Sequence, residues 1–173
     1  ALILRFHKDG RPKKSFAYIS TGNFNEKTAT VYADSALFTS NEELVEDLSN
    51  LFRLLRKEIT EPQFKRLWVP RFNLLPELKR RIGLEANMAL AGKKAYIILK
   101  MNALQDPAMI DELYRASEAG VQIDLIVRGI CCLKPNQPYS KNIRITRIVD
   151  SFLEHARVWY FHNGGKPLVY MGS

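Results

Sequence analysis

The stretch KAYIILKMNALQDPAMIDELYRASEAGVQIDLIV, residues 94–127, decides the fold class. It opens with an apolar segment at 94–101, continues with a helical pattern at 107–119 that Gly120 ends, and closes with a second apolar segment at 121–127. A strand, a helix and a strand in this order are typical of a parallel α/β unit. The sequence therefore predicts an α/β fold.

The end of the second strand is a candidate binding position. Ligands of parallel sheets collect at the carboxyl ends of the strands, and Arg128 follows the second strand directly. A guanidinium there has the fork geometry that suits a phosphate group. The alternative is a salt bridge from Arg128 to Glu154 or Asp150, and the residues alone leave both interpretations open.

Upstream, the clearest pattern is a helix at 41–58, where leucines recur on one face behind acidic residues and ahead of basic ones. Either Ser40 or Asn41 can cap it. The other expected elements are a hairpin of strands at 1–7 and 15–20 around a polar turn at 8–12, a polar loop at 21–30 and an apolar segment at 31–38.

Prolines at 62, 70 and 76 interrupt the pattern and indicate a domain junction near Pro70. Gly92 is expected to end the helix that follows this junction. The remaining elements are expected to be a helix at 76–91, a strand at 143–146, a short helix at 147–154, a strand at 157–161 and strand-like residues at 169–173.

Composition limits the partners. The chain has 173 residues, a formal charge of +8, 46% hydrophobic and 25% charged residues, which excludes a disordered or collagen-like chain. The charge favours an anionic partner: nucleic acid, an anionic membrane, a nucleotide or polyphosphate. Cys131 and Cys132 are adjacent, which argues against a disulfide framework or a cysteine metal site and favours a reducing, cytoplasmic location.

Two further positions are chemically suggestive. The loop Thr21–Thr28 could let backbone amides approach an anion, with Lys27 adding charge, but a turn in which asparagine side chains bond their own backbone is the favoured alternative. Tyr32 could stack on a base, although packing is its commoner role.

His155 stands between Glu154 and Arg157 at an expected helix–strand boundary. Histidine suits proton transfer near neutrality. His155-x-Arg157 also resembles the His-x-Lys half-motif of the phospholipase D superfamily, in which histidine attacks phosphorus and a cation holds the phosphate. A lone histidine is more often structural, so both roles stay open.

Four blocks resemble, in order, the signatures of the bacterial polyphosphate kinase family that works through a phosphohistidine. They are TGNFNEKTA at 21–29, IVRGICCL at 126–133, FLEHAR at 152–157 and FHNGG at 161–165. The resemblance runs over the whole chain, and the four blocks together are specific where each alone is not.

The resemblance implies two phospholipase D-like α/β domains, both incomplete here, at the C-terminal end of a longer protein. Residues 1–69 would be the latter part of the first domain and residues 70–173 most of the second. The implied reaction is reversible transfer of the terminal phosphate of ATP to inorganic polyphosphate. The phosphorylated histidine would lie in a His-x-Lys motif just before Ala1, so the isolated chain is expected to be inactive.

The resemblance also implies site residues. Tyr32, Arg128 and His155 match positions that contact ATP, with His155 the catalytic residue opposite the missing nucleophile. Mg²⁺ is an implied cofactor whose ligands lie outside this chain. ATP or ADP and polyphosphate are the implied partners, without nucleic acid, and homo-oligomerisation and peripheral membrane association of the full-length protein are further expectations.

Two other functions stay open on the residues. One is a phospholipase D-type phosphodiesterase or nuclease, disfavoured because Arg157 replaces the lysine and no acidic residue follows at the usual short distance. The other is a non-catalytic basic module that binds nucleic acid, disfavoured because no helix-turn-helix, zinc finger or aromatic RNA-binding signature is visible.

Overall fold

The structure is a computed structural model that describes residues 1–8, 11–149 and 151–173, without the side chains of residues 11–13. The chain packs as two compact units. Unit 1 comprises residues 1–20 and 35–75, and unit 2 comprises residues 21–34 and 76–173.

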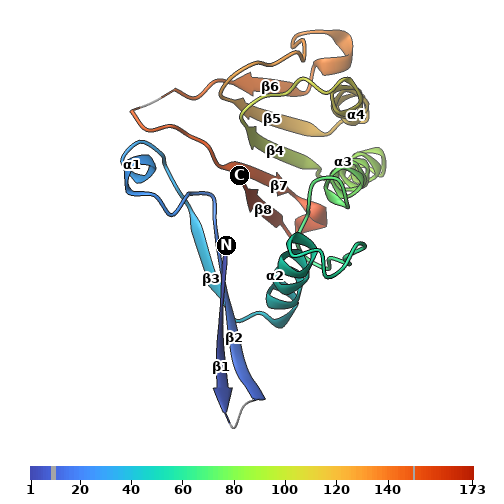
Figure 1. The fold of residues 1–173 in the computed structure, drawn as a ribbon. Helices are drawn as coiled ribbons and strands as arrows, with labels where there is room; N and C mark the ends of the chain where they lie inside the picture. Colours follow the sequence, from blue (N-terminus) through green and yellow to red (C-terminus); the bar gives the residue numbers. More distant parts are fainter. Residues whose placement is uncertain (9–10, 150) are drawn as a thin grey trace. The chain divides into compact units, whose positions relative to one another are not determined.

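Unit 1 is an antiparallel sheet with one long helix. Strands β1 (Leu2–Lys8), β2 (Arg11–Ser20) and β3 (Ala36–Thr39) pair in that order, and α2 (Glu42–Leu55) lies along β1 and β2 (Figure 1). The predicted hairpin is confirmed, but β2 begins at Arg11, inside the segment expected to turn. The antiparallel ladder continues that far, with Lys8 opposite Arg11.

Helix α2 shows why this unit holds together. Asn41 is its N-cap, and the Asn41 side chain accepts a hydrogen bond from the amide of Leu44 at 3.0 Å. Leu48 is fully buried, as is Asp47. The Asp47 carboxylate accepts hydrogen bonds from three consecutive amides, those of Lys65, Arg66 and Leu67, at 2.6–2.9 Å. It thereby ties the proline-rich segment to α2.

Unit 2 contains a five-stranded mixed sheet. Its strands are β4 (Tyr96–Met101), β5 (Gln122–Val127), β6 (Ile143–Thr146), β7 (Arg157–Phe161) and β8 (Leu168–Gly172), in the order β6-β5-β4-β7-β8. Strands β4, β5 and β6 are parallel, and β7 and β8 are antiparallel to their neighbours. The carboxyl ends of β4 and β5 and the amino end of β7 therefore lie at the same end of the sheet.

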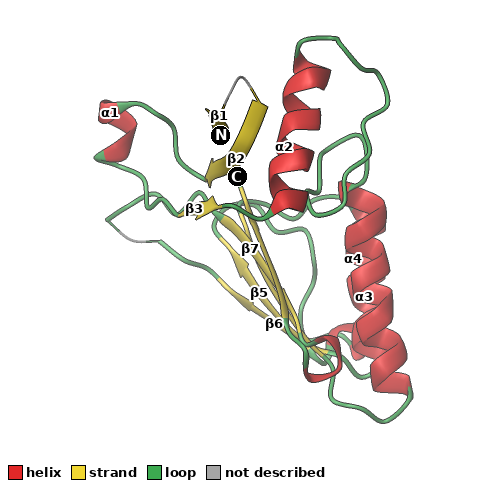
Figure 2. Cartoon of the chain, turned by 90° about the horizontal axis from the view of Figure 1, so that it is seen from below, coloured by secondary structure: helices red, strands yellow, loops and turns green. Residues whose placement is uncertain are grey.

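Two helices cover one face of this sheet. They are α3 (Leu74–Leu90) and α4 (Pro107–Glu118), which Figure 2 shows on the same side of the strands. Alternate strand residues point toward them, so Ile97, Leu99, Ile123 and Leu125 are almost completely buried. The predicted strand–helix–strand unit is confirmed, and with it the α/β fold class.

The helix boundaries follow local chemistry. Asp106 caps α4, its side chain accepting from the amide of Met109 at 2.8 Å, and Gly120 follows the helix with a φ of 103°. Gly92 follows α3 in the same left-handed region, as expected. Helix α3 begins at Leu74, two residues before the expected start, and Pro76 lies in its first turn.

The expected helix at 147–154 is wrong over its described residues. The backbone there pairs with a distant segment instead, because Leu153 donates to Val31 at 2.7 Å and accepts from Ala33 at 3.2 Å. Arg147 is also held, its Nε donating to the backbone oxygen of Arg128 at 3.1 Å. These tertiary hydrogen bonds replace the ones that a helix would make.

The polar loop expected at 21–30 holds one helical turn, α1 (Glu26–Ala29). The other short elements are the 3₁₀ turns η1 (Pro138–Ser140) and η2 (Asn163–Gly165). Within the described part of the chain, every helix is too short or too polar to cross a bilayer.

Candidate anion-binding site

The candidate site lies in unit 2, where β4 and β5 end and β7 begins. The ladder between β4 and β5 continues beyond both strands, because Arg128 donates its amide to Met101 at 3.2 Å and Gly129 donates to Asn102 at 2.8 Å. A Cβ on Gly129 would lie 2.9 Å from the backbone oxygen of Asn102. This close approach requires glycine, and it positions Arg128 beside the end of β4.

Arg128 is not paired with the Glu154 carboxylate. Its Nη1 donates to the backbone oxygen of Glu154 at 3.2 Å, whereas the Glu154 side chain forms an ion pair with Lys100 at 2.8 Å. Asp150, the other expected partner, lies outside the described residues. Among the residues that are described, no ion pair includes Arg128, so its charge is available to an anion.

His155 is contacted on both ring nitrogens. Its Nδ1 lies 3.2 Å from the side-chain amide of Asn102, and its Nε2 lies 3.2 Å from Nη1 of Arg157. Burial lowers the pKa of His155 below its ordinary value, and the charges of Arg157 and Arg128 lower it further. His155 is therefore neutral near pH 7 and able to accept a proton.

Arg157 adds a second guanidinium to the same place. Burial lowers the pKa of Arg157 below its ordinary value, and the nearby charge of Arg128 lowers it further. Like charges held close together create a strong positive potential. A phosphate group would relieve this repulsion by accepting hydrogen bonds from both side chains.

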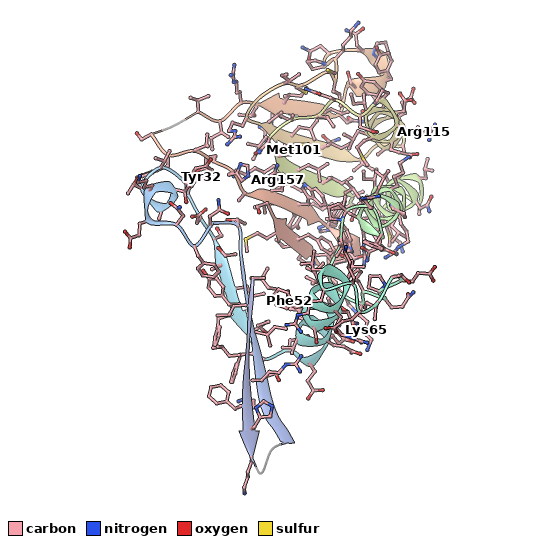
Figure 3. All side chains as sticks on the ribbon, viewed as in Figure 1. Tyr32, Phe52, Lys65, Met101, Arg115 and Arg157 are labelled. Carbon is pink, nitrogen blue, oxygen red and sulfur yellow. The ribbon has the colours of Figure 1, made fainter. Side chains whose placement is uncertain are left out.

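Tyr32 reaches the site from the other end of the sequence. Its backbone forms an isolated parallel bridge with Leu153, and its ring meets the imidazole of His155 edge-to-face, with centroids 5.6 Å apart. Figure 3 labels Tyr32, Met101 and Arg157 at the same end of the sheet. The structure thus brings Tyr32, Arg128 and His155, all three residues singled out in the sequence, into one region.

The loop Thr21–Thr28 uses its polar groups internally. Asn25 caps α1, and its side-chain oxygen accepts from the amides of Lys27 and Thr28 at 3.0 and 3.2 Å. Asp34 packs close to Gly22, since a Cβ there would lie 2.2 Å from its carboxylate. These contacts match the local turn that the composition favoured over an anion-binding loop.

Sequence reasoning missed Asn102 and Lys100 and gave Arg157 no firm role. The sequence did contain a signal for Arg157, because His155 and Arg157 are two residues apart at the start of a strand and such residues share one face. Asn102 could have been found because it follows β4 directly, as Arg128 follows β5. Lys100 had no local signal, since its role depends on Glu154, a contact made only in the folded chain.

The residues around His155 do not fit a magnesium ion. Mg²⁺ needs oxygen ligands, usually one or two carboxylates. Glu154 is paired with Lys100, and the cations Arg157, Arg128 and Lys100 outnumber Asp34, the carboxylate that also acts on His155. No cluster of three or more His, Cys, Asp or Glu with metal-binding geometry occurs among the described residues.

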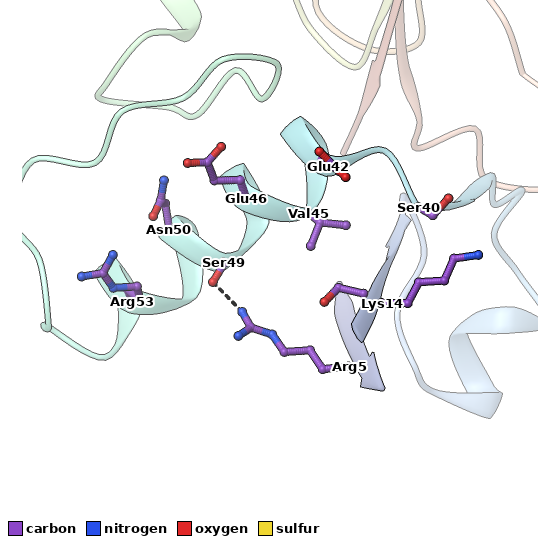
Figure 4. Close-up of a pocket in the computed structure, with 10 residues that line it drawn as sticks. Arg5, Lys14, Ser40, Glu42, Val45, Glu46, Ser49, Asn50 and Arg53 are labelled. Carbon is purple, nitrogen blue, oxygen red and sulfur yellow. Dashed lines mark hydrogen bonds between the residues drawn. The ribbon is translucent and has the colours of Figure 1, made fainter. Parts of the chain in front are cut away.

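Unit 1 has a separate cavity of about 700 Å³ between the hairpin and α2 (Figure 4). Arg5 spans it and donates from Nη2 to the hydroxyl of Ser49 at 2.8 Å. The lining mixes cations such as Lys14 and Arg53 with Glu42 and Glu46. It therefore lacks the excess of positive charge found around His155. Cys131 and Cys132 in unit 2 are free thiols.

Comparison with known proteins covers the whole chain. Residues 1–61 match the family model described as polyphosphate kinase C-terminal domain 1, and residues 67–173 match that of C-terminal domain 2. Polyphosphate kinase from Synechocystis is 43% identical over 99% of this chain, and polyphosphate kinase 1 from Chlorobaculum tepidum is 43% identical over 99%.

A solved structure shares the fold. The crystal structure of polyphosphate kinase from Porphyromonas gingivalis superposes with a TM-score of 0.88 at 50% identity, over 96% of this chain and 28% of that one. The chain spans about a quarter of the length of the curated relatives from Synechocystis and Chlorobaculum tepidum, 24% and 25% respectively.

Proposed function

The chain belongs to the polyphosphate kinase family, with its phospholipase D-like α/β fold, and on that premise we propose that it carries part of an ATP and polyphosphate site. The proposed reaction of the longer protein is reversible transfer of the terminal phosphate of ATP to polyphosphate through a phosphohistidine. The observation that supports it most is the convergence of Arg128, Arg157 and neutral His155.

The two arginines are proposed to hold phosphate. Each guanidinium offers paired donors to phosphate oxygens, and such charge-assisted hydrogen bonds are roughly twice as strong as neutral ones. Phosphoryl transfer depends mainly on positioning and on neutralising charge, which Arg128 and Arg157 would supply together. Lys100 stays paired with Glu154, and its charge also acts on His155.

His155 is proposed to contact the transferring phosphate and to accept a proton at Nε2, the ring nitrogen that faces Arg157. Tyr32 is proposed to contact the nucleotide from the opposite side of the imidazole. The phosphoacceptor histidine that the family resemblance implies is none of the three in this chain. Mg²⁺ is proposed to accompany ATP, with ligands outside these residues.

The two domains of residues 1–69 and 70–173 remain part of this proposal. By packing, residues 21–34 belong with unit 2. The site proposed for the second domain therefore includes Tyr32 from the part of the sequence assigned to the first.

A binding experiment on the 173-residue chain tests the substrate class. ATP, polyphosphate and duplex DNA are titrated at one salt concentration, because charge-driven binding of each of them weakens as salt rises. The chain should bind ATP or polyphosphate more tightly than DNA. Arg128→Ala should weaken phosphate binding about tenfold or more, since a hydrogen bond to a charged group contributes roughly 1.5–3 kcal/mol.

Arg115→Ala is the matched control. Arg115 lies on α4 and pairs with Glu112 at 2.7 Å, so its removal should leave ATP and polyphosphate binding unchanged. Tighter binding of DNA, or equal loss in both arginine variants, would contradict the proposal. The chain alone should show no ATP-dependent polyphosphate synthesis or autophosphorylation. Detection of either would overturn the proposal that the phosphoacceptor histidine lies outside this chain.

In a full-length polyphosphate kinase, alanine at the position matching His155 should abolish most phosphoryl transfer while the fold persists. Near-normal turnover would contradict the proposed catalytic role of His155. Cleavage of nucleic acid or phospholipid would instead support a phosphodiesterase.

A further inference from the structure

The contacts of His155 determine where its imidazole holds the proton. Nη1 of Arg157 lies 3.2 Å from Nε2, and a guanidinium has donors only. This contact is a hydrogen bond only when Nε2 accepts. A neutral imidazole carries one proton, and that arrangement places it on Nδ1, the nitrogen that faces Asn102.

Asn102 can accept a hydrogen bond from this proton. Its Oδ1 is buried and makes no hydrogen bond to any of the described residues. A half-turn of the amide about the Cβ–Cγ bond exchanges Oδ1 and Nδ2 without changing the shape of the side chain. Oδ1 then faces Nδ1–H of His155, and both ring contacts become hydrogen bonds. With the proton on Nε2 instead, that N–H would point at the donors of Arg157.

The backbone holds Asn102 in place for this task. Its carbonyl accepts from Gly129 at 2.8 Å, and two residues later Leu104 donates to Ile130 at 2.9 Å and accepts from Cys132 at 2.8 Å. Leu104 is buried, which anchors the segment on the core of unit 2. Asn102 is therefore carried by a rigid extension of the sheet.

We propose that Asn102 is a positioning residue that holds His155 in the Nδ1–H tautomer, so that Nε2 presents its lone pair toward Arg157 and the anion site. An acceptor at Nε2 is what proton transfer from a bound phosphate requires. The tautomer itself follows from contacts within the chain, whereas its use in phosphoryl transfer rests on the proposed function.

The test is ¹⁵N NMR of the chain labelled at histidine, without ATP or polyphosphate. The wild type should show a proton-bearing Nδ1 and a proton-free Nε2 on His155. Asn102→Ala should shift the Nδ1 resonance toward the unprotonated range, because the ring loses its acceptor. Asn102→Asp keeps an acceptor oxygen and should restore a proton-bearing Nδ1.

Asn142→Ala is the control for loss of a half-buried asparagine. Asn142 donates to the backbone oxygen of Ser117 at 2.7 Å, at the other edge of the sheet, so this variant should keep the His155 signature. A proton on Nε2 in the wild type, or an unchanged pattern in a folded Asn102→Ala chain, would overturn the proposal. If the tautomer is as expected but neither ATP nor polyphosphate binds, the role of Asn102 stands and the proposed function fails.

Discussion

The guanidinium of Arg157 lies against the imidazole of His155, with Nη1 3.2 Å from Nε2, and the same Nη1 donates to the backbone oxygen of His155 at 3.1 Å. A cation so close to a histidine disfavours the imidazolium. The pair therefore combines a fixed positive charge for an anion with a neutral acceptor beside it.

Removal of the Arg157 charge should raise the pKa of His155. The charged groups that act on His155 are Arg157, Arg128 and Lys100, which lower its pKa, and Asp34, which raises it. We expect Arg157→Gln to move the pKa of His155 upward, toward the ordinary value, as measured by NMR titration of the ring. Arg115→Gln on α4 should leave it unchanged, and a downward shift in Arg157→Gln would contradict the assignment.

The same shift predicts a pH dependence of stability. The folded-state pKa of His155 is lowered, so the unfolded chain binds its proton first as the pH falls. The contribution of neutral His155 is therefore present above about pH 6.5, the ordinary value for histidine, and is lost as the pH falls through the folded pKa. Denaturant unfolding at pH 7.5 and pH 5 should show a smaller loss for His155→Gln than for the wild type. An equal loss in both would show that His155 is not the titrating group.

Two glycines should respond oppositely to alanine. A Cβ at Gly129 would meet the backbone oxygen of Asn102 at 2.9 Å, so Gly129→Ala should destabilise the chain by about 1–3 kcal/mol and weaken phosphate binding. Gly83 lies within α3 and has open space where a Cβ would stand, so Gly83→Ala should stabilise by about 0.5–1 kcal/mol. Chemical denaturation measures both changes in the free energy of unfolding. An unchanged value in Gly129→Ala would show that the backbone at the ends of β4 and β5 can move apart to accommodate a Cβ.

Asp47 should be the most sensitive carboxylate of unit 1. It is 1% exposed and accepts from three amides, so Asp47→Ala leaves buried donors without partners and should cost about 2–4 kcal/mol. Glu46→Ala is the neighbouring control, because its ion pair with Lys65 is exposed on both sides and should contribute little to stability. Equal losses in the two variants would argue against the Asp47 clamp.

Much of unit 2 could be predicted because its information is local. Apolar segments located β4 and β5, a terminal glycine ended α4, and the strand–helix–strand order implied parallel pairing. The segment at 147–154 could not be predicted in this way. Its composition suits a helix, but Leu153 finds its backbone partners on Val31 and Ala33, which lie far away in the sequence.

The sequence by itself determined the α/β class and the helix ends, because periodicity and caps are properties of short segments, and its family resemblance singled out Tyr32, Arg128 and His155 as candidate site residues. Only the tertiary structure decided how these residues meet. It paired the Glu154 carboxylate with Lys100, left Arg128 without an ion pair among the described residues, placed Arg157 against Nε2 of His155, and brought Asn102 to Nδ1. The physical reason is that ion pairing and protonation depend on distances between groups, which only the packing of the sheet determines.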